Sequence, residues 1–203
     1  MTPTLIHQGI QALAKADPDV ANAVSWVGTP PAREREKGFA AFFATIVSQQ
    51  VSTAAASAIL QRLHDQLPEL SAEAVMAIDP QRLRDAGLSW RKVDYAKGLA
   101  AATLNGDFDA QALESMDNDT AIQAITALRG FGRWSAEIYL MFSLKRADVF
   151  PADDLALRVA LGQLKGMEQR PTPGQARALV EHWAPWRSIG ALFLWHYYRG
   201  APA

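Results

Sequence analysis

The sequence predicts an all-α protein, folded as one large domain or two small ones. Apolar residues recur at helical spacing along almost the whole chain, and alanine rather than β-branched residues fills the apolar segments. Short stretches rich in Pro, Gly and Asp separate these segments, and no alternating strand pattern or internal repeat occurs. With 203 residues, of which 49% are hydrophobic and 20% charged, the chain can bury a substantial core.

Most of the expected helices begin at a polar cap residue or a proline, and several end at glycine or asparagine. Ser52 or Thr53 is the expected cap of the fourth helix, Asn118 or Asp119 that of the eighth, and Asp153 or Asp154 that of the tenth. In chain order, we expect helices over residues 4–14, 19–27, 39–47, 53–67, 71–77, 80–86, 90–104, 119–128, 133–144, 155–164, 173–183 and 185–198.

Composition excludes several kinds of chemistry. The chain has no cysteine, which excludes disulfides, thiol nucleophiles and cysteine-ligated iron–sulfur clusters. The four histidines are scattered without metal-ligand spacing. No apolar run is long enough to span a membrane, and the N-terminus carries no signal pattern. We therefore expect a cytoplasmic protein without a membrane partner, and a monomer because no oligomer seam is evident.

Charge is unevenly distributed along the chain. The net charge is -1, which by itself argues mildly against a nucleic-acid partner. Residues 1–127 carry a net charge of -5, however, whereas residues 128–203 carry +4. Because DNA binding needs a local basic surface rather than a basic protein, the carboxyl-terminal part is the candidate for such a surface. An asymmetry of this size also arises by chance.

The segment Leu128-Arg-Gly-Phe-Gly-Arg-Trp-Ser-Ala136 joins two predicted helices through a Gly-x-Gly turn. Glycines allow a sharp turn and a close approach by a phosphate, and the amides of the next helix point at the same place. Such a helix-hairpin-helix holds a DNA backbone without reading its sequence. Taken alone, the motif is more often an ordinary helix cap and turn.

A pair of carboxylates, Asp153 and Asp154, opens a helix about twenty residues further on. One of them is expected to cap that helix. The other is a candidate for stabilising positive charge on a sugar while a glycosidic bond breaks, or for guiding water to it. The alternative is that both serve only the helix end.

Two further features suit a flipped nucleotide. Among the six tryptophans, Trp134 and Trp195 are the candidates to stack on an extruded base, whereas most of the others are expected in the core. The segment Ser48-Gln-Gln-Val-Ser52 ends an apolar helix, and a glutamine there suits the gap that such a base leaves. An ordinary polar helix end explains the glutamines equally simply.

Together these motifs resemble the helix-hairpin-helix DNA glycosylase superfamily, nearest to its DNA-3-methyladenine glycosylase II, or alkylation repair, branch. The resemblance covers roughly residues 39 to 198 and rests on motifs that run in the family's order. These are Ser48-Gln-Gln-Val-Ser52, Ala86-Gly-Leu-Ser89 with Lys92, Leu128–Ala136, Phe150-Pro-Ala-Asp-Asp-Leu155, and Pro185-Trp-Arg-Ser188 with Trp195.

The resemblance implies a role for each matching residue. Asp154 matches the catalytic aspartate, with Asp153 as the cap, and Gln50 matches the intercalating position, with Leu88 in the Gly87 loop as its companion. The remaining roles fall into three groups: a base pocket of Trp134, Trp195, Ile138 and Leu155; backbone binding by Gly130, Phe131, Gly132, Arg133 and Ser135; and a structural Na⁺ or K⁺ held by the carbonyls of Thr126, Leu128 and Phe131.

The resemblance also implies an architecture and a reaction. We expect two closely packed helical subdomains, residues 30–115 and residues 1–29 with 116–203, with a cleft between them. Bifunctional members carry a lysine where this chain has Trp134, so a monofunctional enzyme is expected. It would flip alkylated bases such as 3-methyladenine and 7-methylguanine out of duplex DNA and hydrolyse the N-glycosidic bond in base excision repair. The alternatives are a non-catalytic lesion sensor on this fold and a helical scaffold.

Overall fold

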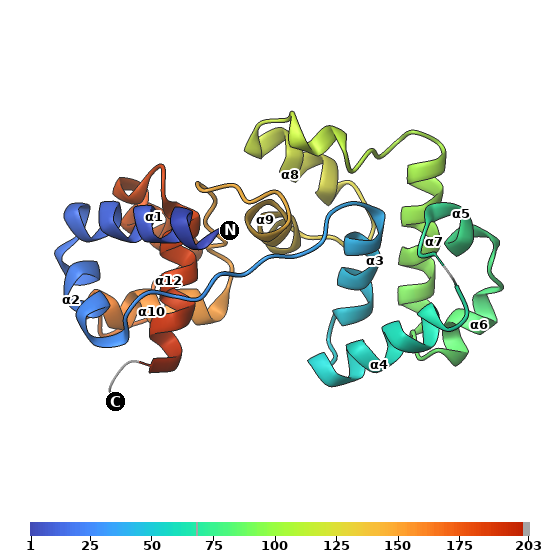
Figure 1. Ribbon diagram of the computed structural model, residues 1–203, viewed down its shortest axis with the longest axis horizontal. Coiled ribbons are helices and arrows are strands. Elements are labelled where there is room, and N and C mark those ends of the chain that lie inside the picture. Colours follow the sequence, from blue (N-terminus) through green and yellow to red (C-terminus); the bar gives the residue numbers. More distant parts are fainter. Residues whose placement is uncertain (68, 201–203) are drawn as a thin grey trace. The chain divides into compact units, whose positions relative to one another are not determined.

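The computed structural model describes residues 1–67 and 69–200, and this part of the chain contains helices, turns and loops but no strand (Figure 1). The predicted all-α class is confirmed. No helix in the described residues is long and apolar enough to cross a membrane. The helices are α1 Pro3–Ala16, α2 Pro18–Val27, α3 Phe39–Ser48, α4 Thr53–His64, α5 Ala72–Ala77, α6 Pro80–Asp85, α7 Trp90–Leu104, α8 Asn118–Thr126, α9 Arg133–Phe142, α10 Leu155–Leu164, α11 Pro173–Leu179 and α12 Arg187–Gly200, with 3-10 turns η1 Ala112–Glu114 and η2 Glu181–Trp183.

Most helix starts follow the predicted cap signals. Ser52 caps α4 by accepting a hydrogen bond from the amide of Ala55. The predicted caps of α8, Asn118 or Asp119, are wrong. Asp117 is the cap, because its carboxylate accepts hydrogen bonds from both the amide and the hydroxyl of Thr120, at 2.9 and 2.7 Å. These hydrogen bonds lower the pKa of Asp117.

The chain divides into two compact units. Unit 1 comprises residues 1–34 and 137–203, and unit 2 comprises residues 35–136. The expected boundary near residue 30 is close to this division, whereas the expected boundary at 115 differs from it by about twenty residues. The difference arises because the hairpin after α8 packs on α3 and α7 of unit 2. The ring of Phe131 meets that of Phe42 at 5.4 Å between centroids.

Unit 1 is built around α12, which packs against α1, α2 and α10. Seven consecutive residues of α12, 188–194, are buried (Figure 1, red helix). Gly190 lies against the indole of Trp183 so closely that a Cβ there would be 2.3 Å from Cε3 of that ring. A glycine is therefore required at this crossing, since any side chain would push α12 away from the core.

Asp17 connects three parts of unit 1. Its carboxylate caps α2 and accepts hydrogen bonds from Lys165 Nζ at 2.7 and 2.8 Å, from Trp183 Nε1 at 2.7 Å, and from His182 Nε2 at 3.1 Å. Burial alone would raise the pKa of Asp17, but the hydrogen bonds from Lys165, Trp183 and His182 together outweigh burial and lower this pKa. The buried charge is thus fully compensated.

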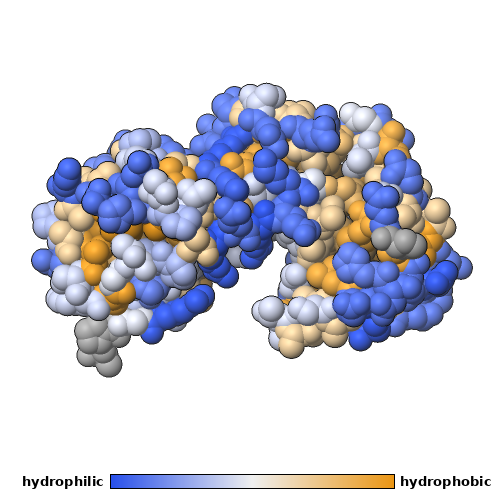
Figure 2. All heavy atoms as spheres, viewed as in Figure 1, coloured by the Kyte–Doolittle hydropathy of each residue, from blue (hydrophilic) through white to orange (hydrophobic). Residues whose placement is uncertain are grey.

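Unit 2 has its core where the apolar helix α3 packs on α4 and α7, and where α5 packs on α7. Phe42 of α3 is buried and meets the edges of two rings, those of Phe108 and Phe131. Lys97 of α7 donates hydrogen bonds to the carbonyls of Met76 and Ile78, which fastens the end of α5. Hydrophobic side chains also reach the surface of both units (Figure 2).

Candidate active site

Asp154 immediately precedes α10 and caps it. The side-chain oxygen Oδ1 accepts a hydrogen bond from the amide of Leu157 at 3.0 Å and one from the indole Nε1 of Trp195 at 3.3 Å. The carboxylate lies at the positive end of a helix dipole, where negative charge is favoured. The expectation that Asp153 is the cap is therefore wrong, because the residue matched to catalysis fills that role itself.

Trp195 lies on α12, and its half-buried ring packs against that of Phe142 at 5.8 Å between centroids. The guanidinium of Arg33 lies over the other aromatic ring, 5.6 Å from the centroid of Phe142. Aromatic surface and a carboxylate therefore meet at one place in unit 1. The sequence contained no signal that the indole N–H of Trp195 would hold Asp154, because the two residues are 41 positions apart.

The residues that flank Asp154 in sequence, or that were expected in its base pocket, divide into exposed and buried ones. Asp153 is exposed and lies 3.5 Å from Arg177 on α11. Leu155, expected in the base pocket, is 55% exposed, whereas Ile138, expected there as well, is 6% exposed. Ile138 therefore offers little surface to a ligand. The assignment of both residues to a pocket stays a prediction.

The hairpin between α8 and α9 belongs to unit 2. Gly130 has a φ of +92°, and a Cβ there would lie 2.4 Å from Cδ2 of Tyr95, so both its conformation and its surroundings require glycine. Phe131 anchors the turn, because its ring is buried and its amide donates to the carbonyl of Leu128 at 3.2 Å. Of the residues expected to meet a DNA backbone, Gly132 and Arg133 are exposed and Ser135 is half-buried.

Trp134 is 43% exposed in the first turn of α9. It belongs to unit 2, whereas Asp154 and Trp195 belong to unit 1. Its predicted role in stacking on a base stays a prediction, as does the predicted cleft.

Gln50 follows α3 and is exposed, with a φ of +55°. A left-handed backbone is uncommon for a residue with a side chain and marks a tightly specified turn. Leu88, expected to intercalate beside Gln50, is fully buried, at 0% exposure. The loop at Gly87 turns Leu88 into the core of unit 2, where an apolar side chain is more stable, and its role in intercalation stays a prediction.

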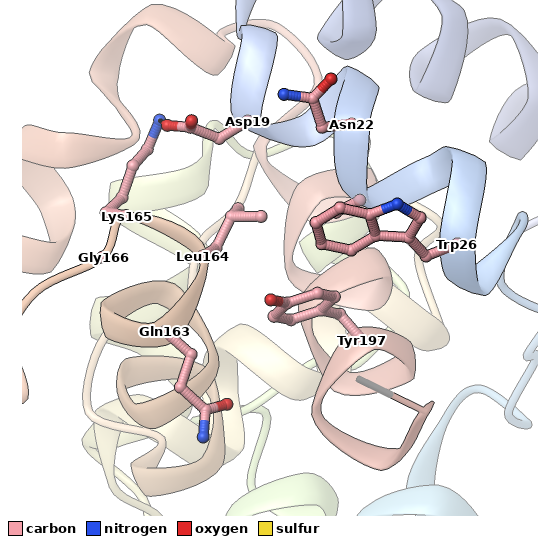
Figure 3. A pocket seen from close by; sticks show the side chains of 9 residues that line it. Asp19, Asn22, Trp26, Gln163, Leu164, Lys165, Gly166 and Tyr197 are labelled. Atoms are coloured by element: carbon pink, nitrogen blue, oxygen red, sulfur yellow. Dashed lines mark hydrogen bonds and ion pairs between the residues drawn. The ribbon is translucent and has the colours of Figure 1, made fainter. Parts of the chain in front are cut away.

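A separate pocket of about 330 Å³ lies in unit 1 at the other end of α10 (Figure 3). Trp26 and Tyr197 supply its aromatic surface, and Lys165 with Asp19 forms an ion pair of 2.8 Å at its edge. Since Asp154 precedes the first residue of the ten-residue helix and Gln163 lies near its last, the two places are separated by about 13 Å along the helix. The pocket is thus not part of the Asp154 site. No group of three or more potential metal-ligating side chains occurs among the described residues.

Comparison with known proteins identifies the class that this fold and these motifs define. Residues 43–185 match the model of the HhH-GPD superfamily of base excision DNA repair proteins, and the chain belongs to that family. The resemblance that the motifs predicted, including the alkylation repair branch, is confirmed.

One sequence match and two structural matches illustrate the similarity. DNA-3-methyladenine glycosylase 1 of Schizosaccharomyces pombe is 33% identical over 168 residues, which cover 80% of this chain and 73% of the relative. Among solved structures, a DNA-3-methyladenine glycosidase from Bacillus halodurans superposes with a TM-score of 0.85 at 28% identity, covering 97% of this chain and 89% of that one. The 3-methyladenine DNA glycosylase of S. pombe in complex with abasic DNA superposes with a TM-score of 0.82 at 30% identity, covering 96% of this chain and 98% of that one.

Proposed function

We propose that this protein is a monofunctional DNA glycosylase that flips alkylated bases, including 3-methyladenine and 7-methylguanine, out of duplex DNA and hydrolyses their N-glycosidic bonds. The observation that carries the proposal is the placement of Asp154, fixed by the amide of Leu157 and the indole of Trp195. A carboxylate oriented in this way suits the developing positive charge of a sugar that is losing its base. The names of the relatives, DNA-3-methyladenine glycosylases, support the substrate class.

In this mechanism different residues bind the phosphates, enter the duplex, stack on the base and stabilise the sugar cation. The hairpin and the start of α9 hold the phosphates, and Gln50 enters the space that the flipped nucleotide vacates. Trp195, which holds Asp154, stacks on the base, and electron-rich rings favour a base that alkylation has made cationic. Alkylation already weakens the glycosidic bond, so Asp154 needs only to stabilise the sugar cation and to orient water.

A monovalent cation at the hairpin fits the residues present. The proposed ligands are the backbone carbonyls of Thr126, Leu128 and Phe131. Thr126 is the last residue of α8, so its carbonyl lies at the negative end of the helix dipole, where a cation is favoured. When bound, Na⁺ or K⁺ would contribute positive charge next to a DNA phosphate. The cysteine-free chain offers no ligand of the kind that iron–sulfur members use.

The absence of strand cleavage is part of the proposal. Trp134 stands where bifunctional relatives carry a lysine, and an indole cannot form a Schiff base with a sugar. The product would therefore be an intact strand with an abasic site. Incubation with borohydride should trap no covalent complex between the protein and DNA.

The decisive experiment compares the wild type with Asp154→Asn and, as matched control, Asp153→Asn. Each is incubated with methylated duplex DNA, free bases are separated by chromatography, and strand breaks are counted with and without alkali. We expect the wild type and Asp153→Asn to release bases, with breaks only after alkali. Asp154→Asn should lose at least about 100-fold in kcat, the scale of removing one preorganised electrostatic group.

Base release by Asp154→Asn at the wild-type rate would exclude Asp154 as the catalytic carboxylate. If the wild type bound lesion DNA without releasing any base, the protein would instead be a lesion sensor on the same fold. Breaks without alkali would contradict the monofunctional assignment.

A further inference from the structure

Gln49, the residue before Gln50, connects the end of α3 to the hairpin. Its side-chain Nε2 donates a hydrogen bond of 2.8 Å to the carbonyl of Gly130, across 81 positions of sequence. Its backbone caps α3 in an extended conformation, and Gln50 follows with its left-handed φ of +55°. All three residues belong to unit 2, so the contact lies within one compact body.

Helix α7 fastens both sides of this contact. Lys92 Nζ donates a hydrogen bond of 2.7 Å to the carbonyl of Val47, in the last turn of α3. Partial burial lowers the pKa of Lys92, as expected for an ammonium group that exchanges water for a helix carbonyl. One turn further along α7, the ring of Tyr95 packs on Gly130. The end of α3 and the hairpin are thus each held to α7, and Gln49 joins them directly.

We propose that Gln49 is a positioning residue, which sets the exposed Gln50 side chain in register with the hairpin that holds the DNA phosphates. The inference rests on the proposed function, since it takes Gln50 as the side chain that enters the duplex. A side chain that enters the stack must stand at a fixed place relative to the phosphates that the protein grips. The amide of Gln49 provides that link, because the carbonyl it holds belongs to Gly130 of the hairpin.

If Gln49 acts by positioning Gln50, substitution of Gln49 should lower kcat/KM only when Gln50 is present. Gln49→Met keeps the length of the side chain and removes the donor, so the turn at Gln50 should lose its register while the hairpin remains. We expect kcat/KM for base release to fall by about tenfold, the scale of one net hydrogen bond. In Gln50→Ala, the additional change Gln49→Met should have almost no effect, because contacting residues that act together are not additive.

A fluorescence measurement tests the same link without catalysis. The probe is a duplex with a tetrahydrofuran abasic-site analogue opposite 2-aminopurine, bound at saturating protein concentration. Wild type should change the 2-aminopurine fluorescence, and Gln50→Ala and Gln49→Met should each lose most of that change. Binding to undamaged duplex should stay within about twofold of wild type, because the phosphate contacts that dominate it are kept. Gln49→Lys, which restores a donor of similar reach, should recover most of the signal.

Gln81→Met is the matched control, because Gln81 also donates one side-chain hydrogen bond of 2.8 Å, to Asp85 on the surface of α6. It should behave as wild type in both assays. Additive losses in the double variant, or a full fluorescence change in Gln49→Met, would overturn the inference. A wild type that changes the fluorescence through Gln50 but releases no base would leave the inference standing and overturn the proposed function.

Discussion

Asp17 and Asp154 begin two helices of unit 1 with the same local motif, yet their surroundings differ. Each carboxylate caps a helix and accepts an indole N–H, from Trp183 at 2.7 Å and from Trp195 at 3.3 Å. Asp17 is 1% exposed and is also paired with Lys165, whereas Asp154 is half-buried at the start of α10. The comparison teaches that the motif alone does not distinguish a structural aspartate from a candidate catalytic one, whereas the burial of the carboxylate does.

The same substitution should therefore lower the free energy of unfolding much more at Asp17 than at Asp154. Asp17→Asn removes the buried charge that accepts hydrogen bonds from Lys165 and Trp183, while Lys165 keeps its ion pair with Asp19, and we expect the free energy of unfolding to fall by about 3 kcal/mol. Asp154→Asn keeps an equally good cap, so its cost should be below about 1 kcal/mol. Urea unfolding of both variants measures this difference. Equal losses of stability would contradict the distinction.

The contribution of Asp17 to stability should also depend on pH. Since hydrogen bonds hold the pKa of Asp17 below its ordinary value, its contribution to stability is complete above that ordinary value. The contribution should be lost progressively as the pH falls below about 4 toward the lowered folded-state pKa. Unfolding measured from pH 6 to pH 3 should therefore show a smaller decrease for Asp17→Asn than for the wild type. Parallel curves would mean that Asp17 carries no such linkage.

Substitution of the two tryptophans that donate to these carboxylates, Trp195 and Trp183, should have the smallest effects. Trp195→Phe keeps a ring against Phe142 and removes the hydrogen bond to Asp154, so kcat for base release should fall by about threefold to tenfold. Stability should change little. Trp183→Phe removes a donor from the buried Asp17 and should instead lower the free energy of unfolding by about 1–3 kcal/mol with little change in kcat. A large fall in kcat for Trp183→Phe would break the comparison.

Local signals in the sequence predicted most of the helices. Their bounds follow from apolar spacing, from caps such as Ser52 and from prolines at first turns, all of which depend on residues a few positions apart. Helix α7 was predicted with its observed bounds, Trp90–Leu104, and the structure shows Ser89 and Asn105 as the caps at its two ends. The resemblance added the aspartate at the start of α10.

Contacts between distant segments could not be predicted in this way. The bond from Gln49 to Gly130 spans 81 positions, and that from Lys165 to Asp17 spans 148. The assignment of the hairpin to unit 2, and not to the subdomain expected from residue 116 onward, also depends on contacts between distant segments. It could therefore not be predicted either. The burial of Leu88 could not be predicted either, because an apolar residue in a short loop can face either solvent or core, and only packing decides which.

The left-handed backbone of Gln50 has a consequence for engineering the specificity of this protein. A library of substitutions at this position would be filtered first by conformation, before any contact with DNA is made. Asn and Gly fit the φ of +55°, whereas Val, Ile and Thr should be depleted because branching at Cβ disfavours that region. Variation in the shape and polarity of the side chain at this position is therefore confined to residues that are not branched at Cβ, and a broader choice would first require rebuilding the turn.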